Sequence, residues 1–80
     1  MMQNDEIIIA ELKEDYSKSG NRRWVIRIVR RPKKPPVLEK RMYEKIGTEW
    51  EQKGRRGLSF QDMKFIVSNS QRILDTLRTE

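Results

Sequence analysis

Residues 53–77 constrain the fold of this chain most, because they join a glycine-bracketed basic turn to a clear helix-start signal. Gly54 and Gly57 enclose two arginines, and glycine lets a backbone turn sharply or approach a ligand closely. Ser59 and Asp62 stand at the spacing of a capping box, in which side-chain oxygens accept hydrogen bonds from the free N–H groups of a helix start. The sequence therefore predicts a basic turn, a short strand and a terminal helix in one unit.

The predicted strand covers residues 55–60, and the predicted helix starts at Ser59 or Phe60. Apolar residues of the helix recur at i, i+3, i+4 and i+7, which places them on one face that we expect to lie in the core. Phe65 lies beside this face, so we expect the helix to be covered on more than one side, as at a dimer interface. The apolar face consists of Met63, Ile66, Val67, Ser70, Ile73, Leu74 and Leu77.

Three segments before the basic turn alternate side chains with the period of β-strands. The first and second are separated by turn residues that include Gly20 and Asn21. A loop with three prolines follows the second, because proline lacks the N–H donor that a central strand needs. In the second segment Trp24, Ile26 and Ile28 alternate with arginines and valines, so one face packs and the other is free for solvent or a ligand. The expected strands are residues 6–13, 22–31 and 37–45.

Residues 46–52 are less regular; Gly47 favours a turn, and we expect a loop or a short strand extension there. Hairpin connections arrange the strands as an antiparallel sheet with one face under the helix and the other open. The predicted fold class is therefore α+β: a four-stranded antiparallel curved β-sheet followed by one C-terminal α-helix (ββββα). It forms a single domain over residues 6–80, after a frayed N-terminus at residues 1–5.

The size of the chain predicts that it needs a partner. A domain of 80 residues is small, and at this scale a chain buries only about 60% of its unfolded surface. The sequence has no cysteine and no histidine, so disulfides and a conventional zinc site are ruled out as additional sources of stability. We therefore expect a homodimer.

The formal net charge is +6 and is unevenly distributed. Residues 21–41 hold nine lysines and arginines against one acid, Glu39. Such clustering is typical of nucleic-acid binding, because each phosphate contact releases condensed counterions. An anionic membrane surface and simple solubility fit the charge as well. No apolar run approaches the roughly 20 residues that span a bilayer, and the acidic start does not resemble a signal peptide. We expect no membrane association and an intracellular location, in the cytoplasm and nucleoid or in the nucleus.

Catalytic residue patterns are missing from the sequence. It has no histidine for proton transfer, no cysteine nucleophile and no phosphate-binding loop of the G-x-x-x-x-G-K-[ST] type. Neighbouring acids such as Glu49 and Glu51 are typical of a solvated surface, and nothing groups the acids at metal-ligand spacing. We expect no enzyme activity, no metal, no cofactor and no small-molecule substrate.

The segment Lys-Gly-Arg-Arg-Gly-Leu-Ser-Phe at residues 53–60 resembles an element of the PC4-like single-stranded-DNA-binding family of transcriptional coactivators. Members carry Lys-x-Gly-(Lys/Arg)-Gly-(Ile/Leu)-(Ser/Thr)-(Leu/Phe) before their one helix. Arg41 and Tyr43 fit a further Ile-Arg-x-aromatic pattern, although the family's strongest matches have tryptophan near Tyr43. The resemblance covers residues 6–77 and is weakest over the first two strands. It implies a dimer joined through the helix and a sheet edge, with adjoining channels for single-stranded DNA.

Residues and resemblance together predict a nucleic-acid-binding face. Arginines of the second and third strands would form a basic field, and an aromatic ring within it would stack on bases. Tyr43 is the favoured ring, Trp50 is an alternative, and Trp24 fits the core better because it alternates with Ile26 and Ile28. The expected site consists of Arg23, Arg27, Arg31, Arg41, Tyr43, Trp50, Lys53, Arg55 and Arg56.

The expected partner is single-stranded DNA bound with little sequence preference, in transcription, replication, recombination or repair. RNA and unwound duplex stay open as partners. A basic module that docks on an acidic protein is one alternative. A β-ribbon that enters the major groove of duplex DNA is another.

Overall fold

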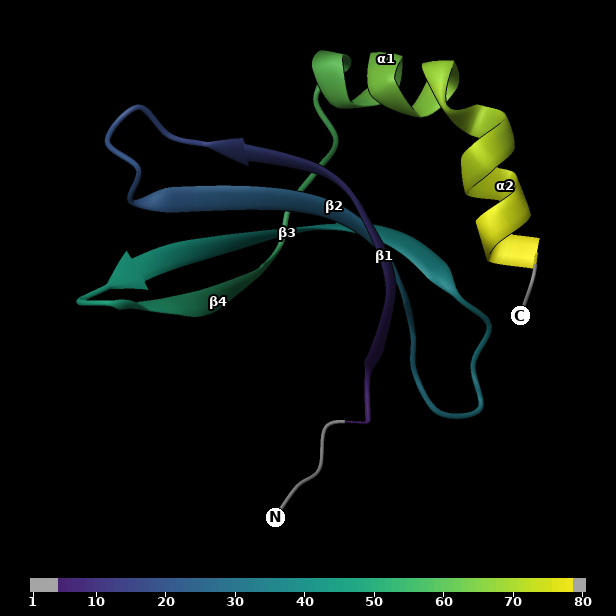
Figure 1. Ribbon diagram of the computed structural model, residues 1–80, viewed down its shortest axis with the longest axis horizontal. Coiled ribbons are helices and arrows are strands. Elements are labelled where there is room, and N and C mark those ends of the chain that lie inside the picture. Colours follow the sequence, from purple (N-terminus) through teal and green to yellow (C-terminus); the bar gives the residue numbers. More distant parts are fainter. Residues whose placement is uncertain (1–4, 79–80) are drawn as a thin grey trace.

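The structure is a computed structural model that describes residues 5–78, so all but the last residue of the terminus expected to be frayed lies outside the described residues. Four strands are followed by two helices (Figure 1). Each strand pairs antiparallel with the next in the order β1-β2-β3-β4, which forms an open sheet and confirms the predicted four-stranded antiparallel arrangement. The strands are β1 Ile7–Tyr16, β2 Arg22–Arg30, β3 Val37–Ile46 and β4 Glu49–Arg55.

The connections follow the turn residues of the sequence. Gly20 and Gly47 both have positive φ, +79° and +64°, in the turns that follow β1 and β3. These angles favour glycine because it has no Cβ. Residues 46–52 were expected to form a loop or strand extension. They supply the end of β3, a tight turn and the start of β4.

The predicted fourth strand at residues 55–60 is wrong, because β4 ends at Arg55. Arg56 still donates its backbone N–H to the carbonyl of Lys40 (3.0 Å), after which the chain leaves the sheet. Ser59 has an extended backbone (φ −84°, ψ 174°) because it caps the first helix, so the apparent alternation around it belongs to a connection. The capping box itself is present, as predicted.

The single predicted helix is interrupted at Asn69, which separates α1 Phe60–Ser68 from α2 Ser70–Arg78. Asn69 donates from its side-chain amide to the carbonyl of Phe65 (2.8 Å), a local bond that competes with regular helix geometry. In Figure 1 the axis of α2 turns sharply away from that of α1. The continuous apolar pattern therefore serves two short helices.

The core lies on β2, which is buried on both faces from Val25 to Val29. The helices add less to this core than the apolar face of residues 63–77 predicted. Ile73 is buried, whereas Met63, Val67 and Leu74 are exposed in the single chain. The expectation that this whole face lies in the core of the protomer is wrong, because α1 and α2 turn only part of it toward the sheet.

Candidate nucleic-acid interface

Strand register places the predicted basic residues on one face of the sheet. Arg23 pairs with Tyr43, Val25 with Arg41, and Arg27 with Glu39 across β2 and β3. Residues directly opposite each other point to the same side of an antiparallel pair. The start of α1 lies on the other side, because Lys40, which precedes Arg41 on β3, bonds Asp62 of the helix. The structure thus assembles the arginine-bearing face, which we call the open face, on the side opposite the helix start.

The open face is concave at one end. Tyr16 of β1 and Trp50 of β4 lie on the two edge strands, yet their ring centroids are only 6.1 Å apart. In a flat sheet these edges would be three strand spacings apart, about 14 Å. The sheet therefore curls toward this face, and two rings meet across it. No pattern in the sequence singles out Tyr16, because its place beside Trp50 depends on this curvature.

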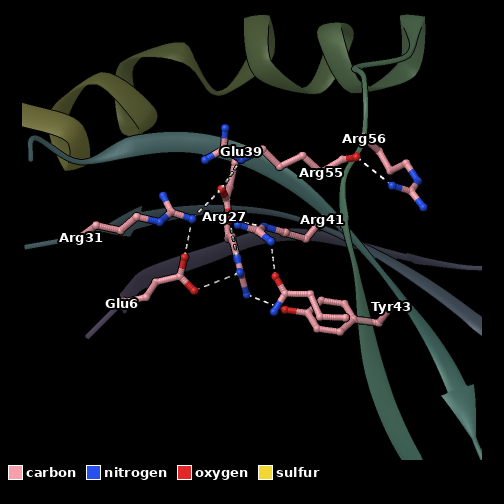
Figure 2. Close-up of polar contacts among 9 residues, drawn as sticks. Glu6, Arg27, Arg31, Glu39, Arg41, Tyr43, Arg55 and Arg56 are labelled. Atoms are coloured by element: carbon pink, nitrogen blue, oxygen red, sulfur yellow. Dashed lines mark hydrogen bonds and ion pairs between the residues drawn. The ribbon is translucent and has the colours of Figure 1, made fainter. Parts of the chain in front are cut away.

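Glu39 is the centre of an ion cluster on the open face (Figure 2). Nitrogens of four arginines lie within 3.5 Å of its carboxylate: Arg41 at 2.9 Å, Arg27 and Arg31 at 3.2 Å each, and Arg55 at 3.5 Å. Its side chain is only 5% exposed. Burial by itself raises the pKa of Glu39, but hydrogen bonds from Arg41 and Arg31 outweigh burial and lower the pKa. Glu39 therefore stays ionised and holds these guanidinium groups in place.

Arg27 lies inside this cluster, only 2% exposed, and not on the surface. Besides Glu39 it contacts the carboxylate of Glu6 (3.5 Å) and donates to the hydroxyl of Tyr43 (2.6 Å). The Tyr43 ring also lies beneath the guanidinium groups of Arg27 and Arg23, 5.9 and 5.4 Å from its centroid. The guanidinium groups of Arg23 and Arg27 thus already lie over Tyr43, the ring that was expected to stack on bases.

Two further predicted cations of the open face, Arg23 and Arg31, are paired as well. Arg23 forms ion pairs with Glu11 and Glu14 of the adjacent strand. Arg31 contacts Glu6 at 2.5 Å in addition to Glu39. Arg23, Arg27, Arg31 and Arg41 therefore each contact at least one carboxylate, in contrast to the free basic field that the sequence predicted.

Cations gather beside this face, in a hollow of about 470 Å³ that we call the basic hollow. Its walls come from the β2–β3 loop, the first half of β3 and the chain that leaves β4. The cationic residues around it outnumber the acidic ones by five to one. The lining residues are Arg31, Lys34, Pro35, Val37, Leu38, Glu39, Lys40, Arg55, Arg56 and Leu58.

Two of these cations, Lys34 and Arg56, have no carboxylate partner among residues 5–78. Arg56 instead donates to the carbonyl of Arg55 (2.8 Å), which holds its guanidinium group near the end of β4. Arg56 was predicted as a site residue, whereas Lys34 was not. The signal for Lys34 was present in the basic, proline-stiffened loop, but its place in the lining of the same hollow as Arg56 depends on the fold.

Asp62 fixes the wall of the basic hollow formed by residues 56–59. Its carboxylate contacts Lys40 of β3 (2.5 Å) and Lys13 of β1 (3.2 Å) and accepts the backbone N–H of Ser59 (2.8 Å). Burial raises the pKa of Asp62, but hydrogen bonds from Lys40 and Ser59 overcome it and hold the pKa far below its usual range. This ionised group ties the start of α1 to two strands.

Two predicted residues lie on β4, away from the basic hollow. Trp50 is half-buried beside Tyr16, with the ammonium of Lys45 5.8 Å from its ring centroid. Lys53 is paired with Glu51 (3.2 Å) and more distantly with Glu44 (3.8 Å). The structure thus divides the predicted set into the paired open face, the aromatic end at Trp50 and the basic hollow.

Over the described part of the chain, no group of three or more acidic, histidine or cysteine side chains is arranged to hold a metal ion. Residues 5–78 also contain no helix with the length and apolarity needed to cross a membrane. No family model matches the sequence, and neither curated proteins nor solved structures give a significant match.

Proposed function

We propose that this chain binds single-stranded nucleic acid, DNA in the first place, with little sequence preference. The observation that carries the proposal is the basic hollow, where five cations from three separate segments converge and two of them lack acidic partners among the described residues. A polyanion gains affinity at such a place because its phosphates release counterions on contact. The role would lie in transcription, replication, recombination or repair, as the resemblance to PC4-like proteins implies.

Bases would stack at the aromatic end of the open face. Trp50 is the better candidate than Tyr43, because two guanidinium groups lie over the Tyr43 ring and its hydroxyl accepts a hydrogen bond from the buried Arg27. The cation beside the Trp50 ring is Lys45, which is exposed. Tyr16, about half exposed and next to Trp50, offers a second ring. A stacked base contributes about 1–3 kcal/mol. A strand that reaches from the basic hollow across the curled sheet to these rings would use both charge and stacking.

The test compares a labelled single strand with the duplex of the same sequence, by fluorescence anisotropy at two salt concentrations. We expect tighter binding of the single strand. Trp50→Ala should weaken single-strand binding by about tenfold or more and leave duplex binding nearly unchanged. Trp50→Phe, which keeps an aromatic ring at the same position, is the matched control and should lose less affinity. Equal affinity for both forms would remove the stacking part of the proposal, and no binding of either form would remove the function.

We further propose a homodimeric ββββα protomer in which α1 and α2 act as one helical unit at the interface. Support comes from the apolar side chains that the helices leave uncovered: Phe60 and Val67 are 74% and 68% exposed, and Met63 and Leu74 are about half exposed. Uncovered apolar patches of this kind are typical of interaction surfaces. A second copy would bury them and supply the stability that a chain of 80 residues lacks.

A further inference from the structure

The basic hollow draws its cations from three separate segments of the chain. Of its five cations, Lys40 is paired with Asp62, Arg31 with Glu6, and Arg55 shares Glu39. Glu6 and Glu39 are also shared with Arg27, so at least two positive charges of the lining are left without a carboxylate of their own. They belong to Lys34 and Arg56, the two lining cations whose side chains meet no carboxylate within residues 5–78.

A surplus of two charges fits one kind of phosphate better than another. A backbone phosphodiester carries a single negative charge, and a strand that passes through a site presents its charges in a row. A terminal phosphomonoester carries about −1.5 to −2 charges at pH 7 on three oxygens at one point. Cations that line one hollow therefore suit the terminal phosphate of a strand better than a single internal phosphodiester.

The geometry also sets the depth of binding. Glu39 is the one acid in the lining of the basic hollow; its side chain is buried and stays ionised, so it would repel a phosphate placed next to it. Lys34 and Arg56 line the hollow without a carboxylate of their own. Arg55 is 67% exposed, and its contact with Glu39 is, at 3.5 Å, the longest of the four that arginines make with this carboxylate, so its side chain can turn outward. A phosphate would therefore be held near the mouth by these three side chains.

The basic hollow is larger than a phosphate. Its volume of about 470 Å³ lies within the range of small-ligand sites, roughly 300–1,000 Å³. Val37 and Leu58, 39% and 46% exposed, and Pro35 provide an apolar wall beside the cations. A sugar and base attached to the phosphate could cover this wall.

We infer that the basic hollow binds the phosphorylated terminus of a nucleic-acid strand, with the phosphomonoester on Lys34 and Arg56 and the terminal nucleoside against Leu58 and Pro35. The inference rests on the proposed single-strand binding and adds to it a preference for a phosphorylated end. The chain would then bind the ends of nucleic-acid strands as well as their interiors.

Three oligonucleotides of one sequence test this inference: one with a 5′-phosphate, one with a 3′-phosphate and one with hydroxyls at both ends. Anisotropy at fixed salt should show about tenfold tighter binding of one phosphorylated form, since a charge-assisted contact is worth about the energy of one decade in affinity. Inorganic phosphate, added as a competitor, shows whether the phosphate group alone is bound at the basic hollow or whether binding needs the attached nucleoside.

The double variant Lys34→Gln/Arg56→Gln should abolish the preference for a phosphorylated end. Lys18→Gln/Arg72→Gln removes the same charge from exposed positions on the β1–β2 turn and α2, and should keep the preference. Equal binding of all three oligonucleotides would overturn the inference and leave the proposed function standing. A preference that survives the first double variant would place the end site elsewhere. Failure to bind any of the three would overturn both.

Discussion

Arg27 is a structural residue although it stands in the middle of a predicted binding face. Its guanidinium group is enclosed by Glu6, Glu39 and Tyr43. We expect Arg27→Ala to lower the free energy of unfolding by about 3 kcal/mol, because it leaves a cavity and removes one partner of a buried ion pair. Urea denaturation followed by circular dichroism measures this change.

Arg56→Ala is the control, because Arg56 is exposed and its side chain bonds only backbone carbonyls. It should change the free energy of unfolding by less than about 0.5 kcal/mol. Its effect should appear in binding: the slope of log affinity against log salt for a single strand should fall by about 0.7. A stability loss at Arg56 that equals the loss at Arg27 would contradict this division of roles.

Alternation in the sequence was sufficient to place Glu39 and Tyr43 on one face of their strand and Arg27 on one face of its own, because the two-residue period of a strand is fixed by its pleat. That these faces lie on the same side of the sheet depends on the register between β2 and β3. Exposure could not be predicted in this way. Whether an arginine reaches solvent depends on which acids the register places opposite it. Glu6 and Glu39 come from different strand ends and meet at Arg27 only after the sheet has formed.

Asp62 couples the helix to the sheet, and its contribution should depend on pH. Folding lowers its pKa below the ordinary 3.8. The stabilisation is therefore fully present above that value and is lost as pH falls further below it. Asp62→Asn keeps an acceptor for Ser59 but removes the charge that Lys13 and Lys40 neutralise. We expect the variant to be less stable by about 2–3 kcal/mol at pH 7.

Urea unfolding of both proteins from neutral to strongly acidic pH measures this difference. It should stay constant near neutrality and shrink once the pH falls below the ordinary carboxylate range, where Asp62 of the wild type takes up a proton. Glu39, whose pKa is also lowered, is unchanged in both proteins and cancels in the comparison. A difference that stayed the same down to the lowest pH would show that the charge of Asp62 does not hold α1 to the sheet.

Local signals predicted the elements better than long-range ones. The start of α1 followed from Ser59 and Asp62, which bond each other within one turn and need no other part of the chain. The interruption at Asn69 escaped prediction because the apolar spacing continues through it. The fourth strand was misplaced because Leu58 and Phe60 alternate like strand residues, whereas the cap at Ser59 commits this stretch to the helix.

Folding redistributes the charge of the molecule. The net charge of +6 predicted a polyanion partner without saying which surface would meet it. Paired arginines line the open face, while Lys34 and Arg56 place their charge at its border, in the basic hollow. The net charge attracts a polyanion from a distance, whereas the unpaired cations would contact it directly. Only the position of these contacts depends on the fold.

The exposed apolar side of α1 predicts that the protein forms a dimer. Phe60 and Val67 lie on one exposed side of α1, and burying them against a second copy would remove the two most exposed apolar side chains of the helices from water. We expect the wild type to sediment as a dimer at micromolar concentration. Val67→Glu should raise the dimer dissociation constant by about tenfold or more, because it places a charge in an apolar interface.

Ile46→Glu provides the matched control, because Ile46 is also exposed but lies at the far end of β3, outside the helical unit. It makes the same change of an exposed apolar residue to glutamate and should leave the dimer intact. Sedimentation equilibrium at several loading concentrations distinguishes the three proteins. A wild type that remained a compact, stable monomer over that range would show that one chain is stable with these side chains in water, and the helices would then lose their proposed role as an interface.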